Sequence, residues 1–264
     1  MGGPAKTGDS VRALTRGIAV LQAINRGGSV TMTEIARASG IPYPTVFRLV
    51  ETLMVEGLVE REPMRRRYRP TALVQTLAHG FQGDGRLVNA ARPHIVALTR
   101  RIGWPISVST PVGHSMVLRD STHALTTLTF SEYFPGYASP IIDSAAGLVY
   151  LASLDADTRA GLLASFRLMA DRQQAAVIDR IEEDELFPAI ATRGYATRAY
   201  NQFTRNPGKT SSIAAPVREP DGRVIGAVAL AFFASALKMP AAEERFAGPL
   251  LECTAAIDAA LAES

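Results

Sequence analysis

A sharp break between two short helical patterns, at residues 39–42, is the feature that most limits how this chain can fold. Before the break, Thr31 and Glu34 have the spacing of a helix capping box, which predicts a helix over residues 32–38. After the break, a proline suited to a first helical turn predicts a second helix over residues 44–55. Two short helices joined by so tight a turn are typical of a helix-turn-helix.

The segments on either side of this turn predict a winged form of the motif. Residues 11–26 predict a preceding helix, because apolar side chains recur at steps of three and four. One face of this helix is expected to carry Val11, Leu14, Ile18, Leu21 and Ile24. Residues 58–61 and 67–70 predict two strands joined by an arginine-rich turn. These elements follow one another in order within about 60 residues, which is specific to a winged helix-turn-helix.

Positive charge is concentrated in the same part of the chain. Residues 1–82 hold 11 Lys and Arg against 6 Asp and Glu, whereas residues 83–264 hold 17 against 19. A basic small segment joined to a near-neutral larger one is typical of a module that binds a polyanion such as DNA.

Length and composition exclude several classes of protein. The 264 residues, 47% hydrophobic and 20% charged, are typical of a globular chain with two domains. The longest apolar run, residues 224–237, is too short for a membrane helix, and no signal-peptide stretch is present, so we expect a cytoplasmic protein. The single cysteine, Cys253, excludes an internal disulfide and a thiolate zinc cluster. Common catalytic motifs and metal-ligand spacings are absent, which predicts no enzyme activity, no cofactor and no metal.

The remainder of the chain predicts an α+β domain. We expect a disordered tail over residues 1–10, the winged motif over 11–70, a linking helix within 71–85 and the larger domain over 86–264. The expected strands of that domain are 106–110, 115–119, 125–130, 195–199, 212–217 and 224–233, and its expected helices are 90–101, 145–153, 157–170, 174–192 and 241–262. Because strand runs and helix runs are segregated along the chain, we expect a largely antiparallel sheet.

Several stretches resemble the IclR-type bacterial transcriptional regulators, over about residues 11–262. The stretches similar to the DNA-binding segment of that family are residues 11–18, Thr33–Ala36 and Gly40–Leu49, and those similar to its second domain are Asp143–Leu151, Arg193–Tyr195 and Ser212–Val217. Within the family, Trp104–Pro105 and Arg119–His123 are most similar to regulators of 3-(3-hydroxyphenyl)propionate catabolism. The resemblance implies a GAF-like effector domain, a homodimer or tetramer, and control of a catabolic operon, with RNA polymerase as a partner if the protein is an activator.

Candidate DNA contacts lie on the helix 44–55 and on the hairpin. If that helix enters the major groove, arginine on it can make a bidentate contact to guanine, and arginines at the hairpin tip can reach phosphates or the minor groove. The expected contacts to double-stranded DNA are Arg16, Tyr43, Pro44, Thr45, Arg48, Arg65, Arg66, Arg67 and Tyr68. The alternative for each is an ordinary exposed residue. Because one helix reads only a few base pairs, two copies should bind a pseudo-palindromic operator.

An effector pocket is expected in the second domain. Ala145, Ala146 and Gly147 open a helix whose free N–H groups and small side chains suit a carboxylate. By the resemblance, further pocket positions fall at Arg198, Ser212, Ala229 and Ala231, where family members that bind small acids have an acidic or polar group.

A pocket with Ser212 as its only hydroxyl favours an aromatic or phenylalkanoic acid. Arg198 or Arg119 is then the expected ion-pair partner, and Trp104 an expected wall. Two alternatives stay open at this point: an enzyme for an acyl or aromatic substrate that carries a DNA-binding domain, and an architectural DNA-binding dimer without a ligand.

Overall fold

The computed structural model describes residues 11–77, 85–128, 135–183, 186–198 and 209–263. The chain divides into two compact units, residues 1–82 and 83–264. Among the described residues, no helix combines the length and apolar character needed to cross a bilayer. The expected disordered tail, residues 1–10, lies outside the described residues.

The first unit is the predicted winged helix-turn-helix. Its elements are α1 (Arg12–Gly27), β1 (Val30–Thr31), α2 (Met32–Ser39), α3 (Tyr43–Val55), β2 (Val59–Arg61), β3 (Arg67–Pro70) and the short α4 (Leu73–Thr76). The three strands form a small antiparallel sheet in the order β1-β3-β2. A core of Ile24, Ile35, Val46 and Val50, all fully buried, joins the three long helices.

The predicted capping box and tight turn are confirmed. The Thr31 hydroxyl accepts a hydrogen bond from the Glu34 N–H at 3.3 Å, and the Thr31 N–H donates to Glu34 Oε2 at 2.7 Å. The Thr31 N–H and the Thr31 hydroxyl, which donates to Glu34 Oε2 at 3.0 Å, are the main reason why the pKa of Glu34 is lowered. Gly40 then ends α2 with φ at 67°, a left-handed conformation that glycine adopts without strain, and Pro42 caps α3.

The apolar face predicted for α1 is exposed over its first half. Val11, Leu14 and Ile18 are 67%, 63% and 48% exposed, and the helix buries Val20, Ala23 and Ile24 instead. At 100° per residue the exposed and buried sets lie on nearly opposite sides of the helix. Helix α1 therefore has two apolar faces. The one that carries Val20, Ala23 and Ile24 contacts the core, and the one that carries Val11, Leu14 and Ile18 is exposed.

The second unit is an α+β domain built on one six-stranded sheet. Its helices and strands, in chain order, are α5 (Gly85–Ile102), β4 (Ile106–Val112), β5 (Ser115–Ser121), η1 (His123–Leu125), β6 (Ala138–Pro140), η2 (Ile141–Asp143), α6 (Ala145–Ser153), α7 (Ala156–Arg167), α8 (Arg172–Glu183), α9 (Leu186–Arg193), β7 (Ala196–Arg198), β8 (Thr210–Arg218), β9 (Val224–Phe233) and α10 (Met239–Ala262). The strand order is β6-β5-β4-β9-β8-β7, and every neighbouring pair is antiparallel, as the segregated pattern predicted.

Three element predictions need correction. The expected strand 125–130 is wrong, because residues 123–125 form a 3-10 turn and Thr126 donates its hydroxyl to the Gly103 carbonyl at 2.6 Å, while residues 129–130 lie outside the described residues. The expected helix 174–192 is two helices, α8 and α9. Of the expected linking helix, only α4 is seen, because residues 78–84 lie outside the described residues.

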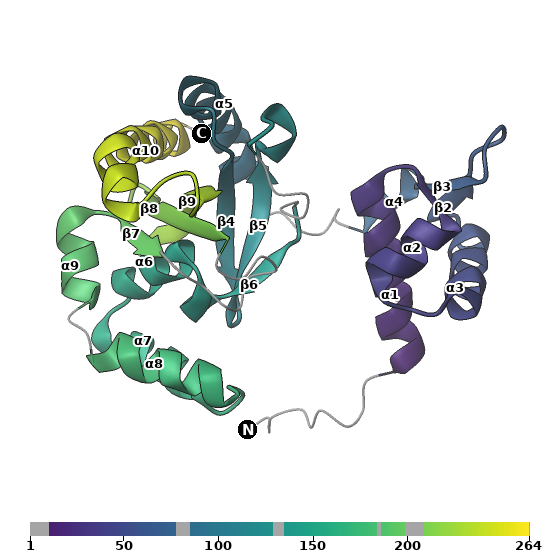
Figure 1. Cartoon of the computed structure of the whole chain (residues 1–264), viewed down its shortest axis with the longest axis horizontal. Coiled ribbons are helices and arrows are strands. Elements are labelled where there is room, and N and C mark those ends of the chain that lie inside the picture. The colour runs from purple at the N-terminus through teal and green to yellow at the C-terminus, as the bar shows by residue number, and fades with distance from the viewer. Residues whose placement is uncertain (1–10, 78–84, 129–134, 184–185, 199–208, 264) are drawn as a thin grey trace. The chain divides into compact units, whose positions relative to one another are not determined.

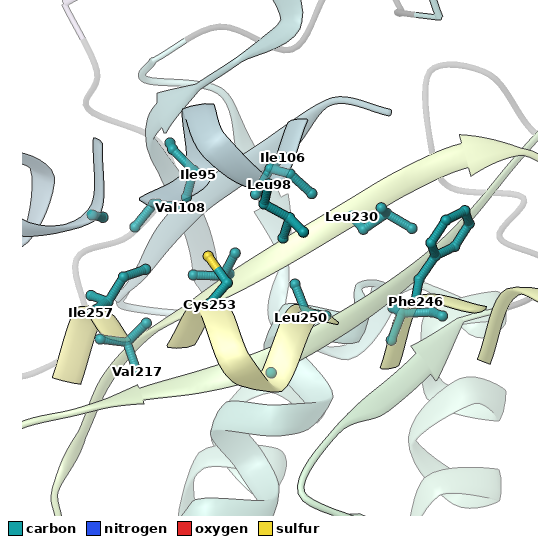
Figure 2. Packing of buried hydrophobic residues seen from close by; sticks show 14 of the residues in the cluster. Ile95, Leu98, Ile106, Val108, Val217, Leu230, Phe246, Leu250, Cys253 and Ile257 are labelled. Carbon is teal, nitrogen blue, oxygen red and sulfur yellow. The ribbon is translucent and has the colours of Figure 1, made fainter. Parts of the chain in front are cut away.

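The sheet of the second unit is covered by helices on both faces (Figure 1). Helices α5 and α10 pack on one face over a large apolar cluster. Figure 2 shows part of this cluster in the layer between the two helices and the sheet, with Ile95 from α5, Leu250 from α10, and Val108 and Leu230 from strands β4 and β9. Helix α6 packs on the other face of the sheet. Side chains from α7, α8 and α9 pack with those of α6 in a second apolar cluster. This second face is where a cavity opens.

Candidate DNA-binding and effector sites

The exposed surface of α3 carries the predicted recognition residues. Tyr43 is 50% exposed at the start of the helix, and Pro44 and Arg48 are also exposed. Thr45 and Arg48 line a shallow hollow together with Arg16 of α1, so the structure brings these three predicted residues together. Phe47, 42% exposed beside them, was missed by the sequence analysis although its place next to Arg48 follows from helical spacing.

The hairpin separates into tip residues and structural residues. Arg65 and Arg66 are exposed in the turn between β2 and β3. Arg67 instead points back toward the segment before β1, where Nη2 donates to the Ser29 carbonyl at 2.7 Å, and Nη2 also lies 3.3 Å from Glu34 Oε2 on α2. Tyr68 packs against the core of the unit. Arg67 and Tyr68 therefore hold the hairpin in place, and their role as DNA contacts stays a prediction.

A cavity lies between the sheet and the start of α6. It has about 820 Å³ of space free of protein atoms, a figure that includes its open mouth. Six of the predicted effector residues line it: Ala145, Ala146, Arg198, Ser212, Ala229 and Ala231. Their convergence follows from strand pairing, since Ser212 lies opposite Ala231, and Ala229 lies between Ala214 and Ser107 on the neighbouring strands.

The cavity wall has more polar side chains than the sequence analysis expected. Ser212 was predicted as the only hydroxyl, but seven serine or threonine residues line the space: Ser107, Ser109, Ser139, Ser144, Thr210, Ser211 and Ser212. The signal for two of them was present, because Ser107 and Ser109 alternate with the buried Ile106 and Val108 along β4. The apolar part of the wall comes from the alanines together with Met116, Leu118 and Pro140.

Two charged side chains of opposite sign line the cavity. Arg198 donates from Nη2 to the Ile142 carbonyl at 2.6 Å, and burial lowers its pKa. Asp143, which the sequence analysis missed, is 4% exposed and precedes Ser144, the residue that caps α6. Burial raises the pKa of Asp143 to about 6, while the Arg198 guanidinium acts in the opposite direction.

Three predicted effector residues do not line the cavity. Trp104 lies on the opposite face of the sheet, in the cluster under α5 and α10, where its ring meets Phe232 edge-on at 6.3 Å between centroids. Arg119 donates from Nε to the Thr110 hydroxyl at 2.7 Å. Gly147 faces η2, because a Cβ atom there would collide with the Ile141 carbonyl oxygen. Its role is close packing of α6 against η2.

Two family models match the chain. The model of the IclR helix-turn-helix domain matches residues 13–63. The model of the C-terminal domain of the bacterial transcriptional regulator IclR matches residues 83–259. The chain belongs to the IclR family. Its members are transcriptional regulators and not enzymes, so the enzyme hypothesis falls.

Individual members of the IclR family are only distantly similar to this chain. The HTH-type transcriptional regulator TsaQ1/TsaQ2 of Comamonas testosteroni is 27% identical over 65% of this chain, which spans 62% of that protein's length. The DNA-binding transcriptional repressor YiaJ of Escherichia coli is 25% identical over 93% of this chain and 86% of its own length. An IclR homologue from Microbacterium hydrocarbonoxydans, solved as a complex with 4-hydroxybenzoate, is 20% identical with a TM-score of 0.63 over 96% of this chain and all of that one.

Proposed function

We propose that this IclR-family regulator binds a pseudo-palindromic operator through α3 as a homodimer, and that a small aromatic monocarboxylic acid in the α6 cavity controls the binding. The observation that carries the effector half is Arg198, whose guanidinium lines a cavity with an apolar wall and the capped start of a helix. A guanidinium and free helical N–H groups suit a carboxylate, and the alanine and methionine side chains suit a ring.

The DNA half rests on the exposed side chains of α3 and the hairpin tip. A bidentate arginine contact to guanine discriminates by about 1 to 3 kcal/mol, whereas a phosphate contact is blind to sequence. We therefore expect Arg48→Ala to weaken binding and to relax preference at one base of each half-site. Arg66→Ala should weaken all sequences alike.

Binding titrations on the selected operator and on random DNA test this assignment. The logarithm of the affinity should fall against the logarithm of salt concentration with a slope of about −5 or steeper, because each neutralised phosphate contributes roughly 0.9. A slope near zero on the operator, or an Arg48→Ala variant with unchanged affinity and base preference, would overturn the proposed docking of α3.

The homodimer is supported by the exposed stripe on α1. Val11, Leu14 and Ile18 present apolar surface on the side of α1 that faces away from the core of the unit. A pseudo-palindromic operator is bound by two copies of the protein. In such a dimer, α1 of the second copy would cover the exposed apolar stripe. Leu14→Asp should shift sedimentation toward the monomer without unfolding the unit, and an unchanged dimer would remove α1 from the interface.

The ring and hydroxyl pattern of the effector is proposed from the cavity wall. The hydroxyls of lining residues such as Ser107, Ser109 and Ser212 can bind a ring hydroxyl, and a homologue was crystallised with 4-hydroxybenzoate. The test panel is therefore benzoate, 4-hydroxybenzoate, 3-(3-hydroxyphenyl)propionate and their methyl esters. An ester should bind about 10- to 150-fold more weakly than its acid, because a charge-assisted hydrogen bond contributes about 1.5 to 3 kcal/mol.

Thermal shift and calorimetry with matched arginine variants decide the effector assignment. Arg198→Ala should abolish binding of the acid, whereas Arg119→Ala, an arginine outside the cavity lining, should leave it intact. A ligand that binds only the folded protein must also raise its melting temperature. Equal affinity for acid and ester would exclude a carboxylate anchor, and no binding by any member of the panel would favour the architectural dimer.

A further inference from the structure

The effector cavity carries its own carboxylate before any ligand enters. Asp143 ends η2, directly before the cap of α6, and is almost fully buried. Arg198 reaches from β7 and donates to the carbonyl of Ile142, the residue next to Asp143. An acid held beside this guanidinium must therefore share it with a buried protein carboxylate.

The charged surroundings of Asp143 come from few elements. Arg198 attracts its carboxylate, and Asp171, exposed just before α8, repels it. Arg180 on α8 acts in turn on Arg198. Of the described residues that line the cavity, Tyr137 is the one other titratable group, and α6 offers none there.

Two carboxylates that share one cation in a buried site do not both stay ionised easily. Their repulsion in a low-dielectric environment raises the pKa of one of the two carboxylates. The carboxylate that takes up the proton is the one whose burial already favours the neutral form. Burial holds the pKa of Asp143 at about 6, so a nearby second anion would move it above neutral pH.

We propose that a monocarboxylate effector binds with uptake of one proton by Asp143, so that the ligand replaces Asp143 as the counterion of Arg198. This inference rests on the proposed function, because it requires a carboxylate in the α6 cavity. The proton comes from solvent, the ligand stays ionised, and the net charge of the cavity is the same before and after binding.

This coupling gives the binding a characteristic pH dependence. Above about pH 6, Asp143 must be protonated for the acid to bind, so the affinity should fall by up to about tenfold for each further pH unit. Between about pH 5 and 6 the dependence should flatten, because Asp143 is already largely neutral. A neutral methyl ester should bind without proton uptake.

Calorimetry with 4-hydroxybenzoate in two buffers of different ionisation enthalpy, phosphate and Tris at pH 7.5, measures the proton directly. We expect close to one proton taken up by the wild type and none by Asp143→Asn, whose amide resembles the protonated acid. At this pH the variant should bind on the order of 10- to 30-fold more tightly, because it avoids the protonation step.

The matched control is Asp171→Asn, which removes a nearby acid that does not line the cavity. It should retain the proton uptake, with a pH profile shifted slightly toward lower pH because Asp171 no longer raises the pKa of Asp143. Binding without proton uptake by the wild type would overturn this inference and leave the proposed effector class intact. If 4-hydroxybenzoate, benzoate and 3-(3-hydroxyphenyl)propionate all failed to bind both the wild type and Asp143→Asn between pH 5 and 8, the effector half of the proposed function would be overturned, and this inference with it.

Discussion

The two faces of the six-stranded sheet are built by the same strands and differ in what they hold. Toward α5 and α10, residues such as Ile213, Leu230 and Phe232 fill the space completely. Toward α6, Ser212 and Ala231 alternate with them along β8 and β9, and their small side chains leave a cavity. Because successive strand residues point to opposite faces, one face can be specialised for packing while the other is specialised for a ligand.

The comparison explains how the cavity can hold a buried acid without collapse of the domain. Residues that tolerate little change lie on the filled face, where removal of a large side chain leaves a void. Residues that could vary in size lie on the hollow face, where added volume enters empty space. Changes on the two faces should therefore differ in which property they alter, stability or ligand binding.

The largest effect is expected from a truncation on the filled face. Phe232 is fully buried against Trp104, so Phe232→Ala should lower the free energy of unfolding by about 3 to 5 kcal/mol. Urea titration followed by circular dichroism measures the change. Ala231→Ser, one residue away on the cavity side, is the control and should change stability by less than about 1 kcal/mol. Similar losses in both variants would show that the two faces are not distinct.

The local sequence pattern predicted the helices and strands of both units better than it predicted their tertiary contacts. The capping box at Thr31 and Glu34 and the strand over 212–217 depend on neighbours in sequence, and both were correct. Periodicity placed Val11, Leu14 and Ile18 on one face of α1, but it could not indicate whether that face contacts the core. The ion pair of Arg67 with Glu34 could not be predicted, because it depends on the folded hairpin.

The cavity was predicted in part for the same reason. Ala145 and Ala146 came from the small residues at a helix start, and Arg198 came from the family resemblance, which carries positions that are already known to converge. Ser107 and Asp143 were missed because their convergence depends on sheet pairing over long sequence separations: Ser107 lies opposite Ala229, on β9. The alternation along β4 gave the correct face for Ser107, but no sequence signal indicated which face was hollow.

A glycine at the border of the cavity offers a second, smaller test of the comparison. Gly147→Ala places a methyl group against the Ile141 carbonyl of η2, so it should destabilise the second unit by about 2 to 3 kcal/mol, as overpacking does. Gly161→Ala on α7 is the matched control, because its added methyl group meets open space. This control should stabilise by about 0.5 to 1 kcal/mol. Thermal unfolding of both variants measures the difference, and opposite signs are expected.

A third test uses the charge on the hollow face. The pKa of Asp143 is about 6 in the folded chain and ordinarily 3.8, so the folded state binds the proton more tightly. Stability then falls as pH rises between about 4 and 6, because the folded form loses a proton that the unfolded form has already lost. Asp143→Asn lacks this loss and should be more stable than the wild type by about 1 to 2 kcal/mol at pH 7.5.

Urea titrations at pH 4 and pH 7.5 measure this difference. The advantage of Asp143→Asn should disappear at the lower pH, where both side chains are neutral. If Asp143→Asn were less stable than the wild type at pH 7.5, the ionised Asp143 would contribute net stabilisation to the folded state. Its interaction with Arg198 would then outweigh the cost of its burial.

The smallest change in stability, with the largest change in ligand binding, is expected at Ala146. Its side chain lines the cavity at the start of α6, one residue before Gly147, whose hydrogen atom is packed against backbone. Ala146→Leu adds volume to empty space, so the free energy of unfolding should change by less than about 1 kcal/mol. The same volume should exclude an aromatic acid. Calorimetry should detect no binding of 4-hydroxybenzoate, while operator affinity in the absence of effector stays that of the wild type. If Ala146→Leu still bound the acid with wild-type affinity, the ligand would bind elsewhere, and the α6 cavity would not be the effector site.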